Sequence, residues 1–179
     1  LHTAGNPVFM PQKTLGRVNR TRFYFQDRPK FITKLLKEIT NHEVYCYKNG
    51  FKPVVRLNTT SDIPWEIHNV FKLFPKIQFY DYTKIKKRAL KFIKGKYPKN
   101  YHLTFSLNES NYNDSIEILN QGGNVAIVFR NKLPETYKGF KVVNGDLHDL
   151  RFTDPKNVIV GLKAKGLGKT DQSGFVINA

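Results

Sequence analysis

Apolar residues recur every three or four positions along the first fifty residues, which is the spacing of helices with one buried face. The pattern predicts a helix from Met10 to Gln26, after an irregular start at residues 2–9. A second helix is predicted to follow Asp27, because aspartate caps helices well and Pro29 suits the first turn. The apolar face of this second helix consists of Phe31, Leu35, Leu36 and Ile39.

After Gly50 the pattern changes to short apolar runs bounded by polar residues. These runs are predicted to be strands, at residues 53–57, 76–80, 101–105, 124–129 and 157–162. Helix-length segments separate the first four of them, at residues 64–73, 83–94 and 110–120. Strands that alternate with helices indicate a parallel sheet, since a parallel return needs a crossover. The runs are apolar on both faces, as in a sheet that is covered on both sides.

The sequence therefore predicts an α/β fold of repeated βα units with a mainly parallel sheet. We expect a single domain over residues 1–179, with a helical part at 1–50 and the βα repeats at 51–179. The near-constant spacing of the strands favours a partial (βα) barrel over a doubly wound sheet, and no glycine-rich dinucleotide motif follows the first strand. Either arrangement places ligands at the carboxyl ends of the strands.

The chain is strongly basic, with 30 Lys and Arg against 14 Asp and Glu, a net charge of +16 and an isoelectric point near 9.9. Such an excess favours a polyanionic partner such as nucleic acid, because binding releases counterions from phosphates. The alternative is a basic protein whose lysines are simply solvated.

Several other classes of protein fit the sequence poorly. No apolar run approaches the roughly 20 residues that span a bilayer, and the first residues lack the pattern of a signal peptide, so we expect no membrane association. The single cysteine, Cys46, excludes a disulfide within the chain and a metal site made by its cysteines alone. A reducing, cytoplasmic setting is expected.

Polar residues gather after the predicted strands and in a short loop at residues 144–151. An imidazole beside carboxylates can act as a general base or bind a divalent metal, which makes a metal-dependent enzyme one hypothesis. The alternative for the loop is an Asn-Gly turn followed by a surface ion pair. The candidate catalytic residues are Asp62, Asp81, Asp146 and His148.

Cations and aromatic residues indicate a second kind of site. Arginines of the first helix are predicted to form a basic face, and the glycine–lysine loop at 163–169 could contact phosphates. Tyr80 and Tyr82, at the end of a strand, could stack on exposed bases, whereas nearby phenylalanines are expected in the core. The candidate residues for binding anions or nucleic acid are Arg17, Arg20, Arg22, Arg56, Tyr80, Tyr82, Lys84, Arg130, Arg151, Lys163, Lys165 and Lys169.

Short strings spread over nearly the whole chain are together similar to the phage gene product 88 family. The strings that carry this resemblance lie at residues 1–5, 19–21, 55–58, 60–63, 79–84, 103–106, 145–152 and 161–166. The resemblance implies a location in the cytoplasm of an infected bacterium, with the virion as the alternative.

Members of that family carry a cysteine cluster just before the Leu-x-Thr-Ala-Gly string, whereas this chain begins at Leu1. The resemblance therefore implies a piece of a longer protein, in which an iron–sulfur cluster or a divalent metal is held ahead of the βα units. That layout is similar to radical-SAM-like proteins by analogy. No cofactor is expected within the chain itself.

The leading hypothesis is a phage accessory protein that binds nucleic acid or another polyanion through its basic surface and strand ends. The first alternative is a metal- or iron–sulfur-dependent enzyme, in which Arg56, Arg130 and Lys163 would hold an anionic substrate. The second alternative is a structural or virion-associated protein whose charge serves packing against nucleic acid or a partner.

Overall fold

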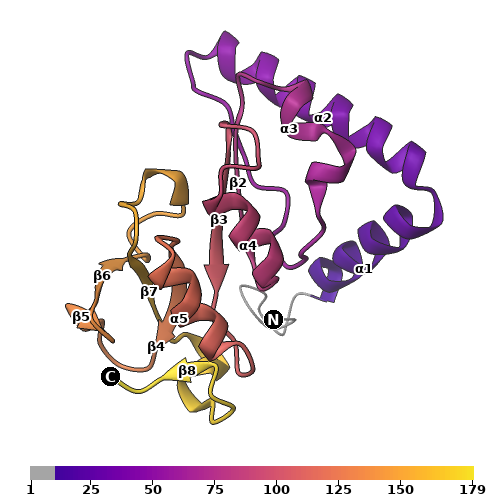
Figure 1. Cartoon of the computed structure of the whole chain (residues 1–179). Helices are drawn as coiled ribbons and strands as arrows, with labels where there is room; N and C mark the ends of the chain where they lie inside the picture. The colour runs from indigo at the N-terminus through magenta and orange to yellow at the C-terminus, as the bar shows by residue number, and fades with distance from the viewer. Residues whose placement is uncertain (1–10) are drawn as a thin grey trace. The chain divides into compact units, whose positions relative to one another are not determined.

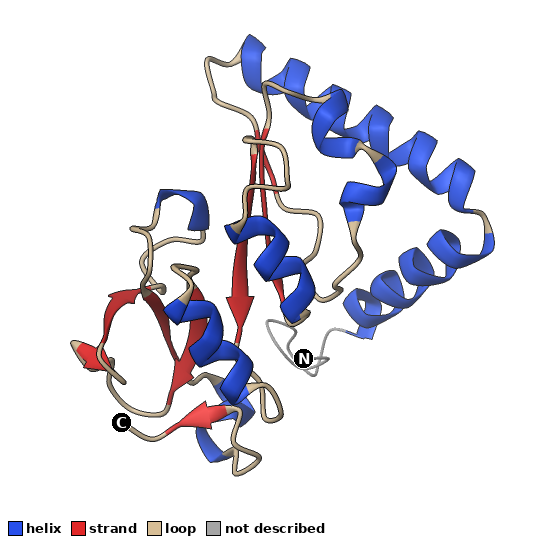
Figure 2. Ribbon diagram, in the orientation of Figure 1, coloured by secondary structure: helices blue, strands red, loops and turns tan. Residues whose placement is uncertain are grey.

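The computed structural model describes residues 11–179, which form two compact units (Figures 1 and 2). The first unit contains the described residues up to Val55 together with Pro64–Ile77, and the second contains Arg56–Ile63 and Gln78–Ala179. The predicted irregular start and Met10 lie outside the described residues. We expect one domain over residues 1–179. Whether the two units unfold together is a property of unfolding and not of compactness, so the single domain stays a prediction.

Two helices, α1 (Pro11–Gln26) and α2 (Arg28–Lys48), make up most of the first unit. Asp27 separates them and caps α2, as predicted: its carboxylate accepts a hydrogen bond from the backbone N–H of Lys30 at 3.2 Å. Within residues 11–179, no helix is both long enough and apolar enough to cross a bilayer.

An aromatic cluster forms the core of the first unit. The ring of Tyr24 meets Phe31 and Trp65 edge-on, with centroid distances of 5.5 and 5.6 Å. Its hydroxyl lies in hydrogen-bonding contact with Nε2 of His68 at 3.0 Å. Edge-on ring pairs of this kind stabilise a core beyond the area that they bury, so this cluster joins α1, α2 and the segment after residue 63.

Two predicted elements of the first unit are shorter in the structure. The helix predicted at 64–73 is divided into η1 (Trp65–His68) and α3 (Val70–Leu73), because Asn69 between them adopts a left-handed conformation with φ of 55°. The strand predicted at 53–57 is β1 (Val54–Val55), because hydrogen bonds to side chains hold the following residues in a loop.

The second unit contains a mainly parallel sheet, which confirms the predicted α/β fold. Its strand order is β2-β3-β4-β7-β6-β5, and within the described residues this path is open rather than closed. The first three strands follow chain order with a helix in each crossover, without the reversal that defines a doubly wound sheet. The predicted elements are β2 (Gln78–Thr83), α4 (Lys86–Ile93), β3 (Tyr101–Ser106), α5 (Tyr112–Asn120), β4 (Val125–Phe129) and β7 (Ile159–Lys163).

Three short strands lie outside the predicted pattern: β5 (Thr136–Tyr137), β6 (Phe140–Asn144) and β8 (Val176–Ile177). β6 pairs in parallel with β7 and antiparallel with β5, and β8 pairs with the carboxyl half of β4. Strands of two residues are too short to show an alternation of polar and apolar positions. Two 3-10 turns, η2 (Arg151–Thr153) and η3 (Gly166–Thr170), precede and follow β7.

Helices α4 and α5 cover one face of this sheet (Figure 1). Ala89 from α4 and Ile118 from α5 join the same buried cluster as Phe105, Ile127 and Phe129 from the strands. The sheet therefore holds the carboxyl ends of its parallel strands in fixed positions, which is what a site at those ends requires.

Candidate functional site

The carboxyl ends of β2, β3, β4 and β7 lie at one edge of the sheet, because these strands pair in parallel. Lys84, Arg130 and Lys163 stand at that edge, as the sequence predicts. The contacts of each side chain decide whether it is available to a ligand.

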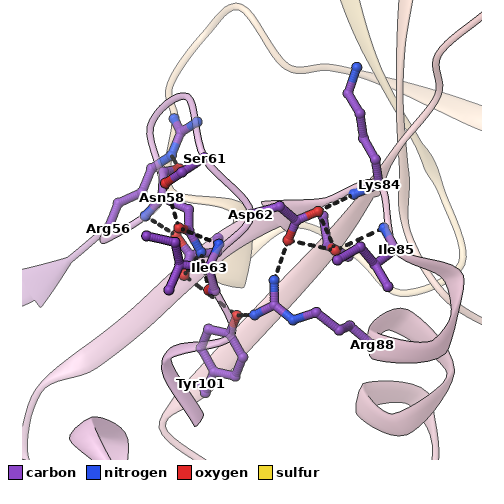
Figure 3. Close-up of polar contacts among 11 residues, drawn as sticks. Arg56, Asn58, Ser61, Asp62, Ile63, Lys84, Ile85, Arg88 and Tyr101 are labelled. Carbon is purple, nitrogen blue, oxygen red and sulfur yellow. Dashed lines mark hydrogen bonds and ion pairs between the residues drawn. The ribbon is translucent and has the colours of Figure 1, made fainter. Parts of the chain in front are cut away.

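Asp62 is held by hydrogen bonds at the end of β2 (Figure 3). Its carboxylate accepts from the hydroxyl of Thr83 at 2.8 Å and from the backbone N–H of Lys84 at 2.8 Å, and it forms an ion pair with Arg88. The same Thr83 hydroxyl accepts a hydrogen bond from the N–H of Ile85 at 3.0 Å. Asp62 thus fixes the turn from β2 into α4.

Asp81 lies in the middle of β2 and is only 1% exposed. Its carboxylate accepts from the backbone N–H of Asn58 at 2.7 Å and from the hydroxyl of Tyr101 at 3.4 Å. Burial raises the pKa of Asp81 to about 7, although the Asn58 hydrogen bond and the charge of Arg88 oppose the shift.

Arg88 links the two carboxylates, since it pairs with Asp62 and donates to the hydroxyl of Tyr101 at 3.0 Å (Figure 3). The structure thereby brings two predicted catalytic residues, Asp62 and Asp81, into one network. The sequence analysis missed Arg88 and Tyr101. The sequence signal for each is a polar group at a position that the pattern predicts to be buried, in a helix for Arg88 and in a strand for Tyr101.

A second network surrounds Asp149. Its carboxylate accepts from the hydroxyls of Tyr80 and Tyr82, each at 3.1 Å, and pairs with Arg56 at 2.6 Å. The guanidinium of Arg56 also lies over the ring of Tyr82, 4.6 Å from its centroid. Burial and the neighbouring Asp149 raise the pKa of Tyr80 to about 12. These contacts occupy both tyrosine hydroxyls, and Tyr80 itself is buried.

Arg151 is fully buried and belongs to the core. It donates to the backbone oxygens of Gly145 and His148, and its Nη1 lies 3.4 Å from Oδ2 of the buried Asp154 carboxylate. Gly145 must be a glycine, because a Cβ there would lie 2.9 Å from Nη1 of Arg151 and 2.5 Å from a methyl group of Val160. The ion pair of Arg151 is therefore internal, whereas Asp149 and Asp146 of the same loop form partly exposed pairs with Arg56 and Lys165.

Asp146 is held at the end of β7, apart from the other predicted carboxylates. It accepts from the backbone N–H of Lys163 at 2.9 Å and from Nζ of Lys165 at 2.8 Å. Burial raises its pKa, but the hydrogen bonds from both lysines outweigh burial and leave it below the ordinary value. Residues 145–146 form a turn, and residues 147–150 follow it without regular secondary structure.

Nothing in the described residues fits a metal centre. Within residues 11–179, no three His, Cys, Asp or Glu side chains lie together so that they could hold an ion. An iron–sulfur cluster is ligated by several cysteine thiolates, and the single Cys46 is buried in α2. The residues of this chain therefore do not fit that cluster.

Most predicted anion-binding cations of the second unit are engaged inside the protein. Arg130 donates to the backbone oxygens of Lys169 and Asp171 and to the amide oxygen of Asn178. Lys84 lies over the ring of Phe175, 5.2 Å from its centroid. Of the predicted set in this unit, Lys163 and Lys169 have exposed side chains that form no ion pair with described residues, although the charge of Lys163 helps to lower the pKa of Asp146.

The predicted arginines of α1 are free of acidic partners but do not share one face. Successive residues of a helix are about 100° apart, so Arg22 lies about 160° around α1 from Arg20. Arg17 and Arg20 are about 60° apart and share a side of the helix. No lysine or arginine in the described part of the first unit forms an ion pair with a carboxylate.

A row of exposed residues along α2 contains four lysines that form no ion pair with any described residue. Their positions fall within about 80° of one another around the helix, opposite the buried Ile39 and Cys46. Glu38 and Glu43 lie about 80° and 140° from the line through Lys30 and Lys48. We define the α2 stripe as Lys30, Lys34, Lys37, Asn41, Tyr45 and Lys48.

The α2 stripe is not among the predicted sites, although its signal is present in the sequence. Lys30, Lys34 and Lys37 have the i, i+4, i+7 spacing of one helical face. That spacing indicates an exposed basic face only when the opposite face of the helix is buried, as it is at Ile39 and Cys46.

The fold and these networks define a mainly parallel α/β protein with a basic helical unit. The family model described as Gene product 88 matches residues 1–179, so the chain belongs to that family, as its sequence resemblance indicates. No curated protein and no solved structure matches the chain.

Proposed function

We propose that this protein binds nucleic acid through phosphate contacts made by the α2 stripe. The four lysines of the stripe carry the proposal, because they are exposed, lie on one side of a helix and have no acidic partner in the described residues. A basic line along a helix is the electrostatic footprint of a protein that contacts phosphates. In a phage-infected bacterium this activity would suit an accessory role in the host cytoplasm.

The length of the stripe supports several phosphate contacts at once. Lys30 and Lys48 are 18 positions apart, which corresponds to about 27 Å along the helix axis. Flexible lysine side chains on a rigid helix bind phosphates as point charges without reading bases. Binding through the stripe is therefore expected to be independent of sequence and strongly dependent on salt.

The test is a titration of labelled oligonucleotides of random sequence across a salt series. We expect wild-type affinity to fall as salt rises, and Lys34→Glu/Lys37→Glu to reduce the slope of log Kd against log salt by about 2. Both side chains are exposed and unpaired, so the variant should fold normally.

The matched control is Lys132→Glu/Lys156→Glu, which changes the net charge equally at exposed lysines of the second unit. We expect this variant to lose much less affinity than the stripe variant. Equal losses would show a response to net charge alone, and an absence of salt-dependent binding by the wild type would remove the proposal.

A further inference from the structure

Tyr45 is an exposed aromatic residue within the row of lysines on α2. It is 60% exposed, and among residues 11–179 its ring contacts no other aromatic ring and no cation. The rings of Phe31 and Trp65, by contrast, pack against Tyr24. A free ring in a basic row is the combination that holds unpaired bases, since every base has a face that can stack.

The distances from Tyr45 to the lysines on either side of it suit a base stacked on the ring and nearby phosphates bound by the lysines. Tyr45 lies eight residues after Lys37 and three before Lys48, or about 12 and 4.5 Å along the axis. Asn41, between Lys37 and Tyr45 on the same side, offers an amide that can donate to a phosphate or a base. A strand lying along the stripe would meet a cation, an amide, a ring and a cation in that order.

We propose that the α2 stripe selects single-stranded nucleic acid, with an unpaired base stacked on Tyr45 and flanking phosphates bound by Lys37 and Lys48. This inference rests on the proposed function and adds the class of nucleic acid. A duplex offers the same phosphates, but its bases are stacked on one another and cannot give a face to Tyr45. The ring therefore contributes to binding of a single strand and adds nothing to binding of a duplex.

Tyr47 provides an internal control for this role. It is 51% exposed, similar to Tyr45, but it lies about 160° around the helix from Tyr45 and off the stripe. Both tyrosines are exposed, so alanine at either position should leave the fold intact.

The experiment compares a fluorescent single-stranded 20-mer with a duplex of the same length, by anisotropy at one fixed low salt concentration. We expect Tyr45→Ala to weaken single-strand binding about 5- to 100-fold and to leave duplex binding unchanged. Tyr45→Phe should keep single-strand binding, because the ring remains. Tyr45→Leu should lose it although it is apolar, and Tyr47→Ala should bind as the wild type does.

One outcome rejects this inference alone, and another rejects the proposed function as well. If wild type binds both forms equally and Tyr45→Ala changes neither, the single-strand inference is wrong and the phosphate contacts of the lysines stand. If the wild type binds neither form at low salt, both fail. Far-UV circular dichroism and the urea midpoint of each variant show whether a loss reflects unfolding, and in that case Tyr45→Leu and Tyr45→Phe decide the matter.

Discussion

The two units of the protein have the same excess of positive charge but use it differently. The first contains 12 Lys and Arg against 4 Asp and Glu, and the second contains 18 against 10. In the first, no described cation forms an ion pair, and four lysines line the outer side of α2. In the second, Arg56, Arg88 and Arg151 each pair with a carboxylate of the same unit.

Net charge alone therefore does not mark an interface in this protein. The strand ends, where an α/β fold usually binds ligands, carry arginines that the structure itself requires. Among the exposed cations that form no ion pair, the four lysines of the α2 stripe lie on a helical surface that the strand-end rule does not consider.

The largest effect is expected from removing Arg88. Arg88→Met keeps the aliphatic stem but removes the ion-pair partner of Asp62 and the donor to the Tyr101 hydroxyl. We expect the free energy of unfolding to fall by about 3–5 kcal/mol, measured by urea denaturation. The control is Lys87→Met at the neighbouring exposed position, which should change it by less than about 0.5 kcal/mol. Similar stability of both variants would contradict a structural role for Arg88.

The next effect concerns the dependence of stability on pH. The pKa of Asp81 is about 7 in the fold and 3.8 for the ordinary group. Between these two pH values the native state keeps a proton that the unfolded chain has released. Asp81 thus contributes stability that is full below about pH 4 and is lost as pH rises through 7, by an amount on the order of a few kcal/mol.

The measurement is the difference between the wild-type and Asp81→Asn stability curves from pH 4 to 8. The difference is required because burial lowers the pKa of His102 to about 4, which gives a trend of opposite sign between pH 4 and 6.5. We expect the wild type to lose stability relative to the variant as pH rises. A flat difference would show that Asp81 titrates in the fold as it does in the unfolded chain.

A smaller effect is expected from the tyrosines around Asp149. Tyr80→Phe and Tyr82→Phe each remove one hydrogen bond to its carboxylate, which should cost about 0.5–1.5 kcal/mol in the free energy of unfolding. Oligonucleotide affinity should not change in either variant, in contrast to Tyr45→Ala. A loss of affinity with unchanged stability would indicate that the tyrosine hydroxyls at the strand ends contact nucleic acid.

The smallest effect is expected at the exposed ion pair of Lys165 with Asp146. Lys165→Ala should reduce the free energy of unfolding by at most about 1 kcal/mol, because solvent screens exposed pairs. Its oligonucleotide affinity should remain near that of the wild type, as Lys165 is already paired. A loss as large as that of Lys34→Glu/Lys37→Glu would place the phosphate contacts in the second unit as well.

The sequence shows the parts of the fold whose signals are local. Asp27 and Pro29 predict the start of α2, and the apolar runs predict β2, β3, β4 and β7 within a few residues. The short strands β5 and β8 have no such signal, because two residues cannot show a period. β8 depends on pairing with β4, which is distant in the sequence, whereas β5 pairs with the adjacent β6.

The candidate sites are less visible in the sequence because they depend on pairing across the sheet. Asp149 meets Tyr80 and Tyr82 although 69 and 67 positions separate them. Nothing local distinguishes the buried Arg151 from a surface arginine, nor the engaged Arg130 from a free one. The lysine spacing of α2 is local, but its meaning depends on which side of the helix is buried.

The course of the chain between the units limits how the protein can be divided for experiments. Arg56–Ile63 belongs to the second unit, although the segments on both sides of it belong to the first. A fragment ending at residue 77 would carry this loop without Asp81 and Arg88, and the complementary fragment would leave Asp81 without the N–H of Asn58. Neither unit is a continuous stretch of sequence, so single substitutions in the full-length chain are the sound way to assign binding to one of them.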